Sequence, residues 1–94
     1  MPERDVLFPL GRLVATPGAL QAFDTSGGSP ITYLTRHLHG DWGDLTDDDK
    51  QANTDAVATG SRILSVYHLN DGTKIWIITE ADRSSTCILL PSEY

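Results

Sequence analysis

The segment "SRILSVYHLNDGTKIWIITEADRSSTCILL", residues 61–90, decides the fold. From residue 61 the period changes to two and branched and aromatic residues take over: one row holds Leu64, Val66 and His68, and the other holds Ile63, Ser65, Tyr67 and Leu69. Asp71 and Gly72 then form a pair that is typical of a tight hairpin turn. The most hydrophobic stretch, "TKIWIIT", follows as a central strand, and a second polar turn leads into "TCILL", which Pro91 ends. This pattern predicts a three-stranded antiparallel meander.

The N-terminal half carries helix start signals. Thr16-Pro17 and Ser29-Pro30 each place a capping hydroxyl before a proline at the first helical position, where the missing N–H costs nothing. Gly40 stands where the second helix would end in a left-handed cap. The sequence therefore predicts two consecutive short helices before residue 40.

A third helix is expected over residues 47–59, between a capping Thr46 and a terminating Gly60, and a short strand over residues 10–15 precedes all the helices. The predicted fold class is α+β. It consists of an N-terminal strand, two to three short helices and the meander, with the helices on one face of an antiparallel sheet. No linker interrupts the chain, so residues 1–94 are expected to form a single domain.

Each expected helix has one apolar face, made of Ala19, Leu20 and Phe23 in the first, Ile31, Leu34 and Leu38 in the second, and Ala52, Ala56 and Val57 in the third. The core of so short a chain is small. A single cysteine, Cys87, forms no internal disulfide and is expected to be a buried, inert thiol.

Charge excludes one class of partner. Thirteen acidic residues against seven basic ones give a formal net charge of −6, which repels a polyanion. The cations are scattered along the chain, at Arg4, Arg12, Arg36, Lys50, Arg62, Lys74 and Arg83. Direct binding of nucleic acid is therefore not expected. No apolar run is long enough to span a bilayer and the N-terminus lacks signal-peptide features, so the expected location is the cytoplasm, without a membrane.

Acidic residues concentrate between Asp41 and Asp55, where Lys50 is the only cation. Three aspartates in the first turn of a helix are favoured by the helix macrodipole at about 0.3–1 kcal/mol each. The same residues also suit a protein partner with a basic surface. The sequence is compatible with both interpretations.

The ten residues "RHLHGDWGDL", 36–45, hold the most reactive side chains of the chain. One interpretation is an acid–base site in which His37 or His39 works with a carboxylate. The other is a polar clasp, in which these side chains bond one another and the backbone around a buried Trp42. The candidates for either role are Arg36, His37, His39, Asp41, Trp42, Asp44, Glu80, Asp82 and Arg83.

Metal and cofactor sites are not expected. The H-x-H-x-D pattern of residues 37–41 starts like the zinc motif of metallo-β-lactamase-like hydrolases, but Trp42 stands where that motif has its next histidine. The aspartates lack the spacing of an EF-hand loop, and no phosphate loop or dinucleotide fingerprint occurs.

Three stretches, "LFPLGRLVATPGAL" (7–20), "RHLHGDWGDL" (36–45) and "KIWIITEADRSSTCILLPSEY" (74–94), resemble a widespread family of small uncharacterised bacterial proteins of plasmids and other mobile elements. Its members are called plasmid-related proteins, and some are labelled type I restriction modification subunits. The resemblance implies a bacterial setting between mobile DNA and host defence. This chain is too short for a methyltransferase domain, so the label does not describe a literal activity.

The leading functional expectation is a non-enzymatic protein-interaction or regulatory module, monomeric or homodimeric. Its expected contact surface is the acidic helix 47–59 with the rim around Trp42. The alternative follows from a topological likeness to RelE-like ribonuclease toxins. It is a small ribonuclease or hydrolase that uses His37 or His39 with Arg36 or Arg83.

Overall fold

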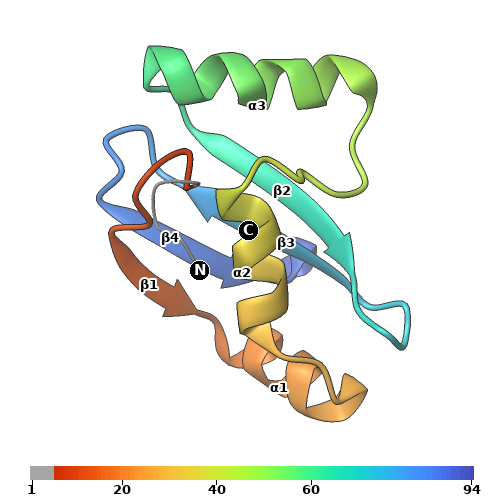
Figure 1. Cartoon of the computed structure of the whole chain (residues 1–94). Helices are drawn as coiled ribbons and strands as arrows, with labels where there is room; N and C mark the ends of the chain where they lie inside the picture. The colour runs from red at the N-terminus through yellow and green to blue at the C-terminus, as the bar shows by residue number, and fades with distance from the viewer. Residues whose placement is uncertain (1–5) are drawn as a thin grey trace.

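The computed structural model describes residues 6–94 and shows an α+β fold with three α-helices and a four-stranded sheet (Figure 1). In chain order the elements are β1 (Arg12–Ala15), α1 (Pro17–Ser26), α2 (Pro30–Leu38), α3 (Asp47–Thr59), β2 (Ile63–His68), β3 (Lys74–Thr79), β4 (Ser85–Leu89) and a short 3-10 helix η2 (Pro91–Glu93).

The three helices begin after Thr16, Ser29 and Thr46, as the sequence predicts, but the hydroxyl of Ser29 makes no capping hydrogen bond within residues 6–94, so the expected cap is wrong there. The hydroxyl of Thr16 accepts from the N–H of Ala19 at the start of α1, and the hydroxyl of Thr46 accepts from the N–H of Asp49 at the start of α3. Gly60 ends α3 with a φ of 80°, a left-handed conformation that glycine adopts at little cost. Local capping chemistry therefore places these boundaries.

The sheet has the order β1-β4-β3-β2 and is mixed. β2, β3 and β4 pair antiparallel in sequence, whereas β1 joins β4 in parallel. The expectation of a purely antiparallel sheet is therefore wrong at this edge. The three helices, β2 and β3 lie between β1 and β4 in the sequence, and this long connection allows the two strands to pair in parallel.

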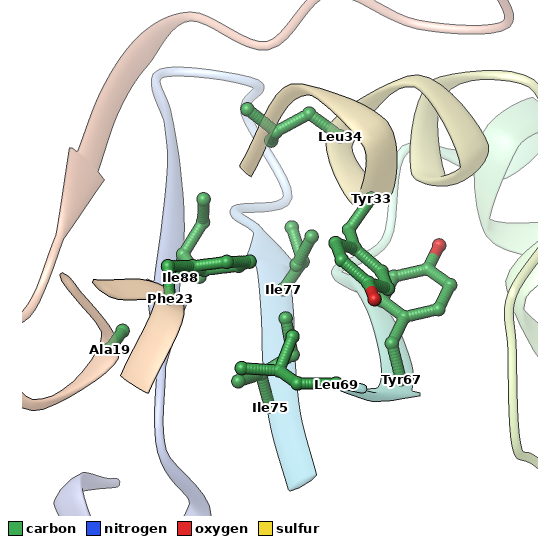
Figure 2. Packing of buried hydrophobic residues seen from close by; sticks show 9 residues of the cluster. All are labelled: Ala19, Phe23, Tyr33, Leu34, Tyr67, Leu69, Ile75, Ile77 and Ile88. Atoms are coloured by element: carbon green, nitrogen blue, oxygen red, sulfur yellow. The ribbon is translucent and has the colours of Figure 1, made fainter. Parts of the chain in front are cut away.

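One face of the sheet holds the main core (Figure 2). Phe23 of α1 and Tyr33 of α2 pack on it, with their ring centroids 5.8 Å apart, and the ring of Tyr33 lies 5.5 Å from that of Tyr67. The cluster consists of Ala19, Phe23, Tyr33, Leu34, Tyr67, Leu69, Ile75, Ile77 and Ile88. Tyr67 and Leu69, which belong to the same alternating row of residues 61–69, both lie in this core.

α3 lies beside β2 at the edge of the sheet, so the helices do not all cover one face as expected (Figure 1). The side-chain amide of Asn53 donates to the carbonyl of Leu64 at 2.7 Å and accepts from its N–H at 3.2 Å. This amide satisfies the outer backbone groups of β2 as a neighbouring strand would, which closes that edge.

The expected helix faces need correction. Ile31 is 66% exposed, and Tyr33 and His37 of α2 point inward in its place. Leu20 of α1 and Ala52 of α3 are also exposed. On a helix with 3.6 residues per turn, neighbouring rows of residues spaced three or four apart lie side by side. The apolar pattern therefore indicates the buried side of the helix but does not fix which of two neighbouring rows faces the core.

Candidate functional site

Segment 36–45 ends α2 and then extends the sheet. The N–H of Val66 donates to the carbonyl of Trp42, and the carbonyl of Val66 accepts from the N–H of Asp44 at 2.7 Å. Gly43 between them forms a parallel β-bridge with Val66 and has a φ of 81°. The segment therefore acts as one more short strand beside β2, and glycine permits the turn that this needs.

Arg36 and Asp41 fasten the two ends of this turn. The Nε of Arg36 donates to a carboxylate oxygen of Asp41 at 2.7 Å, and the N–H of Asp41 donates to the carbonyl of Arg36. The hydroxyl of Tyr67 donates to the carbonyl of Asp41 at 2.6 Å, and its ring centroid lies 4.6 Å from the guanidinium carbon of Arg36. The arginine lowers the pKa of Asp41 by hydrogen bonding, while burial raises that of Tyr67 to about 12.

His37 is entirely inside the protein, with 0% of its surface exposed. Its Nδ1 lies 2.6 Å from the hydroxyl of Ser65, and its Nε2 lies 2.9 Å from the hydroxyl of Thr79. Thr79 continues to the hydroxyl of Thr86 at 2.7 Å, and Thr86 donates to the carbonyl of Leu10 at 2.8 Å. We call Ser65, His37, Thr79 and Thr86 the buried hydrogen-bond chain.

The carbonyl of Leu10, at the end of the buried hydrogen-bond chain, determines which group donates in each hydrogen bond up to His37. Because the carbonyl of Leu10 only accepts, Thr86 uses its single proton there, and Thr79 must donate to Thr86. Thr79 then accepts from Nε2 of His37, which must carry a proton. In the neutral ring Nδ1 is an acceptor, so Ser65 donates to it. With His37 neutral, every group of the buried hydrogen-bond chain is therefore paired.

Burial lowers the pKa of His37 from its ordinary value of 6.5 to about 4. Between these values the unfolded chain binds the proton and the folded chain does not, so stability is fully present above pH 6.5. We expect the free energy of unfolding to fall by about 3 kcal/mol as the pH drops from 6.5 to 4. Denaturant titrations across this range measure the slope. His68→Gln, which changes an exposed histidine, should keep it, and a flat profile for the unchanged protein would contradict the assignment.

A second apolar cluster lies next to the buried hydrogen-bond chain and includes Phe8 and Trp42, both of which are buried. The ring of Phe8 meets that of His37 edge-on, with centroids 5.2 Å apart, and stacks on Trp42 at 6.2 Å. The Nε1 of Trp42 donates to the hydroxyl of Thr54 in α3. Trp42 therefore closes the end of α2 over the core and is not itself a surface anchor.

Arg83 holds α3 to the turn between β3 and β4. Its guanidinium donates to the carbonyl of Ala56 at 2.8 Å and to that of Ser61 at 2.7 Å, and lies 5.5 Å from the ring centroid of Phe8. Its φ of 60° is in the left-handed region, which is uncommon for a residue other than glycine. The positive charge of Arg83 therefore lies at the C-terminal, carbonyl end of α3, where the helix dipole favours it.

The remaining candidates are dispersed. Nδ1 of His39 lies 2.7 Å from the carbonyl of Thr35 and must donate to it, and no partner of its Nε2 occurs among residues 6–94. A carboxylate oxygen of Asp44 lies 3.6 Å from Nδ1 of His68. Asp82 accepts from the N–H of Ser84, and Glu80 is exposed beside it. The structure therefore joins Arg36 with Asp41, and His37 with Trp42, but assembles no open cleft from all nine.

Within the described part of the chain, no three His, Cys, Asp or Glu side chains are grouped so as to hold a metal ion. Sequence reasoning missed the partners of His37. Their signal is present, because Ser65 and Thr79 stand next to large apolar residues in two predicted strands, and a hydroxyl buried in such a strand needs a partner. Cys87 is also half-buried, not buried as expected, and burial raises its pKa.

Comparison of the chain with protein families, curated proteins and solved structures gives no match. In the part that the structure describes, no helix has both the length and the apolar character to cross a bilayer.

Proposed function

We propose that this chain is a non-enzymatic module that binds another protein through the exposed start of α3 and the adjoining rim of segment 36–45. The supporting observation is the burial of His37, whose two ring nitrogens are both engaged by hydroxyls of the sheet. A general acid or base must come within hydrogen-bond reach of a substrate proton. His37 instead closes an internal network, which favours a structural role over the ribonuclease or hydrolase alternative.

The chemistry of the proposed partner is basic. Among the thirteen residues of α3 only Asn53 and Ala56 are buried, and Asp47, Asp48 and Asp49 are exposed in its first turn. Exposed carboxylates on a rigid helix attract a basic surface and raise its association rate. The same aspartates stabilise the helix start, and the two roles are compatible.

Two of the arginines are already engaged in contacts within the protein, which disfavours a polyphosphate partner. Arg36 is paired with Asp41, and Arg83 donates to carbonyls at the end of α3. Binding nucleic acid requires several cations that are free to replace counterions. In keeping with the resemblance to small proteins of mobile elements, we place the protein-binding role between mobile DNA and bacterial defence.

Two charge-matched double variants test the proposal. Asp47→Asn with Asp48→Asn removes two charges from α3, and Asp24→Asn with Glu80→Gln removes two charges elsewhere, all four residues being exposed. Proteins retained from a bacterial lysate by the immobilised chain are identified and purified, and their binding is measured by surface plasmon resonance. We expect the α3 variant to weaken binding by about tenfold, with a smaller dependence on salt, and the control to keep it. Equal effects of the two variants, or no partner while the pure chain cleaves RNA, would overturn the proposal.

A further inference from the structure

β1 (Arg12–Ala15) is an open edge of the sheet (Figure 1). The N–H groups of Arg12 and Thr16 donate to carbonyls of β4, at 2.9 and 3.0 Å. Because alternate residues of a strand point their backbone groups to opposite sides, Leu13 and Ala15 turn theirs outward. Within residues 6–94 these outward groups have no hydrogen-bond partner. The opposite edge is closed by Gly43 and Asn53, so β1 is where the sheet can grow.

We infer that β1 pairs antiparallel with β1 of a second copy of this chain, around a two-fold axis at Val14. In this register Leu13 lies opposite Ala15 of the second copy, and each such pair exchanges both backbone hydrogen bonds. A shift by one residue would put facing side chains on opposite sides of the sheet. A shift by two residues reaches Gly11, whose φ of 65° is not extended, or Pro17, which has no N–H.

The exposed side chains of β1 match in the same register. Leu13 is 46% exposed and Val14 is 41% exposed. Val14 meets Val14 of the second copy on one face, and Leu13 meets Ala15 on the other. Cross-strand pairs of β-branched and aliphatic side chains stabilise a sheet, and here they cover apolar surface that the monomer leaves in water.

Charge complementarity identifies a second copy as the occupant of the edge. Arg12 falls opposite Thr16 of the second copy, and the hydroxyl of Thr16 donates to the carboxylate of Glu93 at 2.5 Å. Directly opposite Cβ atoms lie about 4.5–5.5 Å apart, within reach of an arginine side chain. Each Arg12 therefore meets Glu93 of the second copy, and symmetry makes this ion pair twice. An extended peptide of unrelated sequence would not supply this carboxylate.

The interface is small. Two four-residue strands bury much less than the roughly 800 Å² per partner of a stable dimer, so we expect a reversible dimer with a dissociation constant of about 100 µM. Such a dimer doubles the acidic surface and forms at high local concentration, for example when two copies bind one partner.

Sedimentation equilibrium from about 10 µM to about 1 mM tests the dimer, with Val14→Lys and the β-branched control Val14→Thr. Val14→Lys places two ammonium groups opposite each other at the axis, so we expect about tenfold weaker dimerisation, while Val14→Thr keeps it. Circular dichroism checks that both variants fold. Arg12→Glu should also weaken the dimer, because it faces Glu93 of the second copy.

Amide hydrogen exchange of the unchanged protein gives an independent test that needs no variant. The amides of Leu13 and Ala15 should exchange more slowly as the concentration rises, while that of Val14, already bonded to β4, should not depend on it. A protein that stays monomeric at about 1 mM, or a dimer in which the amides of Leu13 and Ala15 remain unprotected, would overturn the inference. A Val14→Lys variant that dimerises like the unchanged chain would do so as well.

Discussion

Replacing His37 by alanine is expected to lower the free energy of unfolding by about 3–5 kcal/mol, and the midpoint of thermal unfolding by more than about 10 °C. The change leaves a cavity against Phe8 and Trp42, takes away the nitrogen that accepts from Ser65, and removes the N–H that donates to Thr79, which keeps its bond to Thr86. A buried hydroxyl that loses its partner has the full cost of desolvation without compensation. Thermal unfolding followed by circular dichroism measures the effect.

His39→Ala is the matched control for this prediction. Its imidazole is only half-buried and bonds a single carbonyl at the end of α2, so we expect a loss below about 1 kcal/mol. The pair of variants also separates the two classes of function. If His37→Ala left the melting temperature unchanged but removed a measured ribonuclease or hydrolase activity, His37 would be a catalytic residue and the structural interpretation would be wrong.

Gly43→Ala is expected to destabilise the protein by more than about 3 kcal/mol, because a steric clash adds to left-handed strain. Gly43 has a φ of 81°, and an added Cβ would collide with the backbone carbonyl of Val66 and lie 2.7 Å from the ring of Tyr67. Val66 accepts the hydrogen bond that attaches segment 36–45 to β2, so it cannot move aside without breaking that contact. Urea unfolding at neutral pH measures the loss.

Gly60 provides a control with the same backbone conformation and open space. Its φ is 80°, and nothing lies within 4 Å of an added Cβ. Gly60→Ala therefore introduces the strain alone, which costs about 1–2 kcal/mol. If the two variants lost equal stability, the close approach of Gly43 to β2 would not matter, and the attachment of the segment to the sheet would be weaker than its geometry implies.

Segment 36–45 shows how far local reasoning reaches in this protein. Its residues are the expected ones for a polar clasp, and the pairing of Arg36 with Asp41 spans only five positions. The role of His37 was not accessible in this way. Its partners Ser65 and Thr79 lie 28 and 42 positions away, and no spacing rule joins a helix residue to two particular strands.

The meander, the caps of α1 and α3 and the α+β class follow from the sequence alone, because each depends on residues within one or two turns or strands of one another. The parallel docking of β1 on β4, the position of α3 at the edge of β2 and the buried hydrogen-bond chain were decided only by tertiary structure. Each of these joins groups far apart in the chain, whose pairing depends on which buried polar groups find partners once the whole core has formed.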